Sequence, residues 1–530
     1  RHLSCAWARL RKSDWTRQCA EEEPPLHSEQ FSADQMKQHG KVLASLHRLE
    51  AGRSSDRLLS RLAENEALLL DVHTQLTEDV KAGDRITPAA EWLLDNYYVI
   101  EEQIRTARLH LPKGYSRELP CLAGGSSVGL PRVYDIALES ISHSDGQVAP
   151  ESLKSFVIAY QSTTSLNLGE LWAIPIMLRL ALIENLRRVT ARLAVQRVDR
   201  KRAAAWADQM ITIAAKQPQS LILTIADMAR SNPPMVSSFV AELSRRLQGK
   251  GPALALPLTW IEQQLSGSGL TIEQLVFSEN QQQSADQASM SNSIGSLRFL
   301  SVIDWSEFVE STSLVEKSLR EDPAHVYCSM DFSTRDRYRH VVELTARKSP
   351  LSEAEVAHKA IDLASEGATK SGEDALRAHV GYYLIDDGLA QLKKSVRMRH
   401  SSVESMYTLG SRFPLLLYGG GILLATMLFA GGFTAKAQAD GLNAWSLIPM
   451  SLLLLFCTSH LAVALINWLA TLLTTPHPLP RLDYSKGIPE DRRTLVVVPT
   501  MLTSGPAIEA LVKNLEVHFL ANRDKHLRFG

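Results

Sequence analysis

Three acidic residues, Asp95, Glu101 and Glu102, lie in one stretch of the chain where apolar residues recur at helical spacing. Carboxylates on one helix could act as a general acid and a general base, because this pair of roles transfers protons at a reacting centre. A solvated helix face carries the same residues without any chemistry. We favour the solvated face and predict no catalytic residue here.

Four aromatic residues present flat rings that could stack on sugars: Trp92, Tyr97, Tyr98 and Trp172. Large aromatic side chains also supply much of the apolar surface of protein cores. Because Trp92 and Tyr97 fall on the apolar face of the helix that the spacing predicts, we interpret the set as core residues.

Two histidines have polar neighbours in the sequence. His143 and Asp145 lie beside a glycine in SHSDGQ, but a metal site needs further ligands that the sequence does not identify, so we interpret a loop and predict no metal site. His460 and Asn467 are seven residues apart in an apolar run, and therefore on one face of a helix. Such polar groups can mark a transport pathway, but we favour a hydrogen bond between helices.

The composition describes a large, nearly neutral protein. The chain has 530 residues, with 57 Lys and Arg against 58 Asp and Glu, and it is long enough for several domains of about 100–200 residues. The neutral balance argues against a nucleic-acid-binding protein. The scattered cysteines form no CxxC pair, which favours a reducing compartment without disulfides or a zinc site. They are Cys5, Cys19, Cys121, Cys328 and Cys457.

The elements that position these residues are mainly helical. Ser32, Thr271 and Ser352 each begin a capping box, and Thr87-Pro88 is typical of a helix start. We therefore expect an N-terminal helical and linker segment over residues 1–84 and a helical cytoplasmic domain over residues 85–410. Within them the spacing predicts helices over residues 134–142, 150–160 and 168–194, and residues 280–293 are interpreted as exposed helix or loop.

A transmembrane hairpin is predicted over residues 411–475. Its two runs, 413–433 and 445–473, contain no Asp, Glu, Lys or Arg, and each is long enough to cross a bilayer core of about 30 Å as a helix. Glycines at 419–421 and 431–432 permit close approach of the two helices. A hairpin buried in a soluble protein is the alternative that we do not favour.

Basic residues flank the hairpin on both sides, whereas the connecting loop carries only Lys436 and Asp440. Positive flanks stay in the cytoplasm, so we expect both soluble parts there and the loop on the opposite side. The cluster 393–399 could also contact anionic lipid headgroups. The flanking residues are Lys393, Lys394, Arg397, Arg399 and Arg412 before the hairpin, and Arg481, Lys486, Arg492 and Arg493 after it.

The segment 490–530 reads as a strand, a loop and a helix. Residues 494–498 form a β-branched apolar run that is typical of a buried parallel strand. Pro506 then opens an amphipathic helix. Such a unit begins many α/β sheets, whose ligands lie beyond the carboxyl ends of the strands, here at the loop Pro499–Ser504.

Several segments together resemble the N-terminal region of the bacterial cyclic β-1,2-glucan synthases, over roughly residues 85–530. The segments include PAAEWLLDNYYVIEEQIR (88–105), LNLGELWAIPIMLRLALIENLRR (166–188), MDFSTRDRYRHVVE (330–343), HVGYYLIDDG (379–388) and TLVVVPTMLTS (494–504). The resemblance implies a large inner-membrane enzyme that polymerises glucose from UDP-glucose on a protein-attached primer. Its glycosyltransferase domain would be GT-A-like, and a phosphorylase-like domain would follow.

The resemblance also implies what this chain lacks. A GT-A enzyme uses carboxylates to hold Mg²⁺ or Mn²⁺ against the diphosphate and to accept a proton from the acceptor, and in the family these residues lie beyond Gly530. We therefore expect a fragment of a longer protein, with no catalytic or metal-binding residue of its own and no cofactor. By analogy, only Pro499 and Thr500 would lie near a nucleotide.

The expected fold is thus mainly α: a helical cytoplasmic region, the two-helix hairpin, and the first strand and helix of a truncated GT-A-like domain. Its expected partners are membrane lipid, the rest of the synthase chain, UDP-glucose and β-1,2-glucan, and no nucleic acid. A helical interaction module that is tethered to the membrane, without enzymatic activity, is the alternative.

Overall fold

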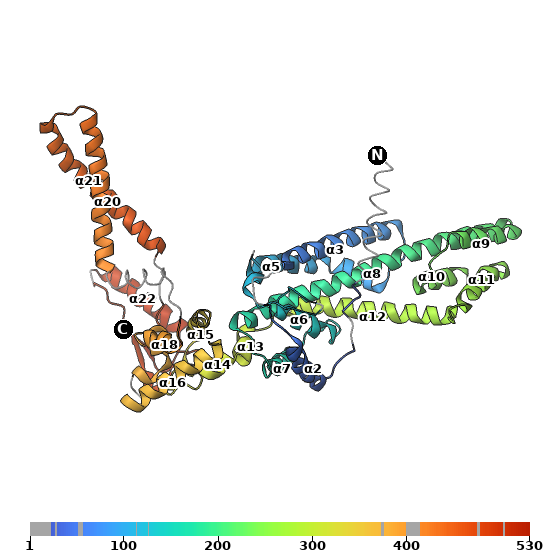
Figure 1. Cartoon of the computed structure of the whole chain (residues 1–530), viewed down its shortest axis with the longest axis horizontal. Helices are drawn as coiled ribbons and strands as arrows, with labels where there is room; N and C mark the ends of the chain where they lie inside the picture. The colour runs from blue at the N-terminus through green and yellow to red at the C-terminus, as the bar shows by residue number, and fades with distance from the viewer. Residues whose placement is uncertain are drawn as a thin grey trace. The chain divides into compact units, whose positions relative to one another are not determined.

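The computed structural model describes residues 23–26, 29–50, 57–112, 114–125, 127–372, 376–398, 414–473, 478–501 and 504–530. These residues form two compact units, Arg1–Leu314 and Val315–Gly530. Both are mainly helical, as the sequence predicted (Figure 1).

The first unit consists of helices joined by loops and short 3-10 turns. Its α-helices are α2 (Ala33–Leu46), α3 (Arg57–Ala82), α4 (Pro88–Asp95), α5 (Tyr97–His110), α6 (Arg132–Ser142), α7 (Pro150–Gln161), α8 (Leu168–Lys216), α9 (Leu221–Arg230), α10 (Ser237–Leu247), α11 (Ala255–Ser266), α12 (Ile272–Phe299) and α13 (Trp305–Thr312). The 3-10 turns are Tyr115–Glu118, Pro218–Ser220 and Pro252–Leu254.

The helix starts that the sequence marks are confirmed. The Ser32 and Thr271 hydroxyl groups accept hydrogen bonds from the backbone N–H three residues on, and both capping boxes are complete. Thr87 is the N-cap of α4, with Pro88 at its first position. The helix predicted from Pro88 onward is interrupted at Asn96, whose backbone leaves the helical region, so α4 and α5 are separate helices.

The structure corrects the predicted length of α8 and the predicted exposure of residues 280–293 in α12. Helix α8 runs for 49 residues, well past the predicted end at residue 194. Its first part packs in one hydrophobic core with α2–α7, α12 and α13, whereas Ala203, Ala207 and Met210 pack in a second core with α9–α11. Figure 1 shows α3 and α12 along its two sides. Residues 280–293, interpreted as exposed helix or loop, lie inside α12, where Asp286, Ser289, Met290 and Ser293 are buried.

The second unit begins with a small helical bundle and continues through the hairpin into a short sheet. Its elements are α14 (Leu314–Leu319), α15 (Phe332–Ala346), α16 (Glu353–Ser371), α17 (Val380–Ile385), α18 (Leu389–Ser395), α20 (Pro414–Ala439), α21 (Ala444–Leu473), β1 (Thr494–Val496), α22 (Gly505–Ala521) and β2 (Leu527–Phe529). Its 3-10 turns are Tyr327–Ser329, Leu376–Ala378 and Glu490–Arg492. The predicted capping box at Ser352 is complete.

Asp322 joins the loops of this bundle through its buried carboxylate. The carboxylate accepts hydrogen bonds from the backbone N–H groups of Val380 at 2.8 Å and Tyr327 at 3.2 Å, and it lies 2.8 Å from Nδ1 of His379. Burial raises the pKa of Asp322, but His379 and these N–H groups outweigh it, so the pKa lies below its usual value.

Helices α20 and α21 pack against each other as the predicted hairpin. Their apolar spans, Leu415–Ala439 and Trp445–Leu473, have mean hydropathies of 1.8 and 2.0. Only 11% of the residues in the most apolar part of each span are buried, whereas a core helix of a soluble protein is mostly covered. The first helix continues to residue 439, beyond the predicted end at 433.

One hydrogen bond and one glycine join the two helices. The Tyr418 hydroxyl donates to Oδ1 of Asn467 at 2.6 Å, the kind of contact predicted for Asn467. For His460 we also predicted a hydrogen bond between the helices, but its ring packs against Phe456 of its own helix. Of the predicted glycines, Gly421 is the one whose Cβ would contact the other helix, 3.4 Å from Ile466 Cδ1.

After α21 the chain returns to the bundle that precedes α20. Leu482 forms an antiparallel bridge with Met330, the Asp331 N–H donates to the Arg481 carbonyl at 3.0 Å, and the Asp483 N–H donates to the Ser329 carbonyl at 2.8 Å. Arg337 also contacts the Pro478 carbonyl. The two flanks of the hairpin therefore lie on the same side of it.

The C-terminal segment is a β-α-β unit. Strands β1 and β2 are parallel, with Thr494 opposite Leu527 and Val496 opposite Phe529, and α22 connects them. The regular strand ends at Val496 rather than at the predicted residue 498, but the Val498 N–H still donates to the Gly530 carbonyl. The parallel strand and the following helix are confirmed, but the strand is exposed and not buried as expected.

Replacing Gly421 by Leu will separate α20 from α21, because the new side chain extends into Ile466, at a cost of about 1–3 kcal/mol. The measurement is cross-linking by a bifunctional maleimide between cysteines placed at Tyr418 and Asn467. Gly420→Leu is the control, since no atom of α21 lies within 4 Å of its Cβ position. Equal loss of the cross-link in both variants would contradict this packing.

Asp322→Asn will destabilise the bundle of the second unit by about 1–3 kcal/mol at neutral pH, because an amide NH₂ then faces backbone donors. The folded-state pKa of Asp322 lies below the unfolded value of about 3.9, so the carboxylate stabilises the fold above that pH and ceases to do so as pH falls through the folded pKa. The difference between the variant and the parent therefore shrinks below about pH 4.

Hydrogen exchange of peptides from α15–α17, corrected for intrinsic rates, measures this effect. Asp362→Asn is the control, because the Asp362 side chain is exposed on the outer face of α16. A difference that stays constant from neutral pH to pH 3 would show that the ionised carboxylate is not what stabilises the bundle.

Candidate functional site

The predicted nucleotide-side residues Pro499 and Thr500 follow β1 and are both exposed. They occupy the loop at the carboxyl end of a parallel strand, where α/β folds place their ligands. Residues 502 and 503 of the same loop lie outside the described part of the chain. The assignment of Pro499 and Thr500 to a nucleotide site stays a prediction.

The acidic and aromatic candidates of the sequence do not converge on one site. Asp95, Glu101 and Glu102 are exposed, and Glu101 lies 3.7 Å from Arg105 in an ion pair of its own helix. This arrangement fits the solvated helix face. Among the aromatic residues, Trp92, Tyr97 and Trp172 pack against the first hydrophobic core. Tyr98 is 63% exposed, and Arg298 donates a hydrogen bond to its hydroxyl at 3.0 Å.

His143 gains neighbours that its sequence context does not show. Nε2 of His39 lies 2.9 Å from the Glu139 carboxylate, Nε2 of His143 lies 3.4 Å from it, and the three potential ligand atoms all lie within 4.8 Å of one another. Imidazole nitrogen and carboxylate oxygen are donors that zinc accepts. The same groups also satisfy one another, and Phe31 stacks on the His143 ring at 3.7 Å. Asp145 takes no part in this group.

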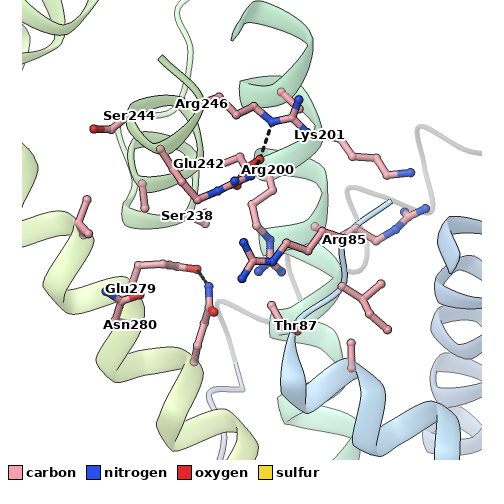
Figure 2. A pocket seen from close by; sticks show the side chains of 18 of the residues that line it. Arg85, Thr87, Arg200, Lys201, Ser238, Glu242, Ser244, Arg246, Glu279 and Asn280 are labelled. Atoms are coloured by element: carbon pink, nitrogen blue, oxygen red, sulfur yellow. Dashed lines mark hydrogen bonds and ion pairs between the residues drawn. The ribbon is translucent and has the colours of Figure 1, made fainter. Parts of the chain in front are cut away.

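A pocket with a volume of about 690 Å³ lies in the first unit, where α8 passes between its two hydrophobic cores. Its walls come from the end of α3, the start of α4, the middle of α8, and from α10 and α12 (Figure 2). Basic side chains gather in it from separate segments of the chain. They are Arg85, Arg197, Arg200, Lys201, Arg245 and Arg246.

Most of these cations are paired with carboxylates. Asp79 contacts both Arg197 and Lys201, and its pKa is lowered because their hydrogen bonds and charges outweigh the effect of burial. Glu242 lies 2.6 Å from both Arg245 and Arg246. In each group the carboxylate offsets part of the positive charge of the two cations that it contacts.

Arg85 and Arg200 differ from the other cations of the pocket. Within the described part of the chain, neither guanidinium lies within ion-pair distance of a carboxylate or donates a hydrogen bond to the protein. Figure 2 shows the two groups facing each other from the loop before α4 and from α8. Burial lowers the pKa of Arg200, the charges of Glu279, Glu242 and Asp286 raise it, and the charge of Arg85 makes a smaller contribution that lowers it. Six basic and five acidic side chains line the pocket, so its net charge is +1.

Sequence reasoning did not identify this pocket. The basic run RVDRKR at 197–202 was the available signal, but the predicted helix ended before it, so these residues were not assigned to a helix face. Arg85 precedes the recognised helix start at Thr87 and carries no motif. Which cations remain unpaired depends on the packing of α3, α4, α8, α10 and α12, which a sequence pattern does not give.

No protein-family model matches the chain. The cyclic beta-(1,2)-glucan synthase NdvB of Rhizobium meliloti (strain 1021) is 33% identical to it over 514 residues, which is 95% of this chain. The chain spans 18% of the length of that relative. The similarity thus extends over most of both units and includes the apolar hairpin. Over nearly its whole length, this chain is homologous to part of a cyclic β-(1,2)-glucan synthase, as its motifs predicted.

Proposed function

We propose that the chain is the membrane-anchored N-terminal part of a synthase that polymerises glucose from UDP-glucose into cyclic β-1,2-glucan. The observation that carries this proposal is the similarity to the Rhizobium meliloti synthase, which extends over 95% of the chain. The β-α-β unit after the hairpin supports it, because parallel sheets of this type begin nucleotide-binding domains.

The proposed location is the bacterial inner membrane, with both soluble parts in the cytoplasm. Backbone pairing of Leu482 with Met330 puts the two flanks of the hairpin on one side. The basic residues in both flanks favour the cytoplasm as that side. Two of them, Arg399 and Arg412, lie outside the described residues, whereas Lys393, Lys394, Arg397 and those after α21 lie within them.

The chain on its own is proposed to be inactive. Its described C-terminal part provides two parallel strands and one helix of the sheet. The carboxylates that would hold Mg²⁺ or Mn²⁺ against UDP-glucose, and the base that accepts the acceptor proton, are proposed to come from the rest of the synthase chain. Pro499 and Thr500 would border the nucleotide, and β-1,2-glucan would be the product.

A labelling experiment tests the proposed orientation. In a variant without its native cysteines, Asn443→Cys between α20 and α21 will react with a membrane-impermeant maleimide in intact spheroplasts. Ser485→Cys after α21 will react only once the membrane is permeabilised. Labelling of Ser485→Cys in intact spheroplasts would contradict a cytoplasmic location.

A second experiment tests substrate use. Membranes that contain only this chain will incorporate no radiolabelled glucose from UDP-glucose into β-1,2-glucan above the level of empty membranes. Membranes with the complete Rhizobium meliloti synthase are the positive control. Incorporation by the chain alone would contradict the proposed inactivity, and a synthase control that uses another sugar nucleotide would contradict the proposed donor.

A further inference from the structure

We propose that the pocket of the first unit binds a soluble organic phosphate, held by Arg85, Arg200 and the amino end of α4. This site is far in the sequence from the strand-end loop, and its proposal does not depend on what the synthase polymerises. It rests on the charges, the buried polar groups and the size of the pocket.

The position of Arg85 and Arg200 favours an anion between them. Two guanidinium groups that face each other repel, and within the described residues neither has a carboxylate at ion-pair distance to offset that repulsion. An anion with two or more charges between Arg85 and Arg200 turns that repulsion into attraction. Guanidinium groups bind phosphate oxygens through pairs of parallel N–H donors, which makes phosphate the matching chemistry.

The start of α4 adds donors to the same space. Thr87, Pro88 and Ala90 line the pocket, and the first N–H groups of a helix have no carbonyl partner within that helix. The amino end of a helix therefore attracts phosphate groups. The Thr87 hydroxyl is buried, caps no N–H group and has no hydrogen-bond partner among the residues that the structure describes. A phosphate oxygen would supply the missing partner.

The size and the remaining walls indicate an organic phosphate rather than a bare ion. The volume of about 690 Å³ lies within the range of about 300–1,000 Å³ that small-molecule sites occupy. Ile86, Ile272, Val276 and Phe277 supply apolar wall next to the arginines. Apolar walls with a few fixed polar groups are typical of sites that bind a ligand with an organic part.

Calorimetric titration of the full chain, purified in a neutral detergent at low salt, tests the proposal with inorganic pyrophosphate as the probe. We expect one site per chain. Arg85→Ala and Arg200→Ala will each weaken binding by about 10–100-fold, the loss typical of a charged hydrogen-bonding partner. Arg200→Lys will also weaken binding, because an ammonium keeps the charge but not the paired donors.

Arg202→Ala is the matched control, since Arg202 lies on the same helix, is exposed and does not line the pocket. It will leave the affinity within about twofold of the parent. Within the described residues, neither Arg85 nor Arg200 forms an ion pair, so we expect their alanine variants to keep the melting temperature of the unliganded chain. If Arg200→Ala lowers the melting temperature, the test rests on the pyrophosphate affinity of Arg85→Ala, whose substitution lies in an exposed loop.

Three results would overturn the proposal. They are no binding of pyrophosphate, an equal loss of affinity in Arg202→Ala, and binding of a short-chain phosphatidic acid without binding of pyrophosphate. The last result would assign the pocket to a lipid headgroup instead of a soluble ligand.

Discussion

The first unit is organised by one continuous helix that serves two hydrophobic cores. The amino-terminal part of α8 is buried on nearly every side, and its carboxyl-terminal part is buried on a stripe that includes Ala203 and Ala207. Between these parts the helix carries charged residues, because a helix that leaves one core and enters another crosses a region with little apolar cover. The pocket lies at this crossing, so its polarity follows from the helix that frames it.

Several charges buried along α8 are compensated by ion pairs within the first core. Glu170 receives both N–H donors of the Arg132 guanidinium at 2.6 Å. Glu184 accepts hydrogen bonds from Arg61, Arg187 and Asn65. Burial raises its pKa, but Arg61, Arg187 and Arg188 lower it by more. Breaking such a pair leaves an uncompensated buried charge, which costs about 3–5 kcal/mol. Arg179 in the first core, which donates to the Gln103 amide, and the two guanidinium groups at the crossing depart from this pattern, because within the described residues none has a carboxylate at ion-pair distance.

Local sequence signals predicted the local structure well. Ser32, Thr271 and Ser352 begin the helices that their capping boxes indicate, and the charge-free runs form the paired apolar helices. A capping hydrogen bond joins residues that are three positions apart, and a charge-free run is a continuous segment. Both signals can therefore be recognised in the sequence alone.

The remaining features depend on residues that are distant in the sequence. Helix α8 was predicted too short because the polar run after residue 194 resembles a helix end, whereas the second core, formed by α9–α11, extends it. No short sequence pattern predicts that Leu482 pairs with Met330. The same holds for Arg85 and Arg200, which face each other from separate segments. The prediction for Pro499 and Thr500 rests on analogy with the strand-end loops of α/β folds, and no pattern in the sequence identifies their partners.

The apolar side chains of β1 and of the residue after it are exposed, which affects the behaviour of the protein in solution. Leu495 in β1 and Val497 directly after β1 are 62% and 60% exposed, on a sheet of two short strands. A parallel sheet is stable when both faces are covered, and an uncovered apolar edge is a template on which further chains add as strands. Detergent that shields α20 and α21 does not occupy these backbone groups. Self-association of purified chains would therefore begin at this strand, and a charged residue in place of Val497 would suppress it.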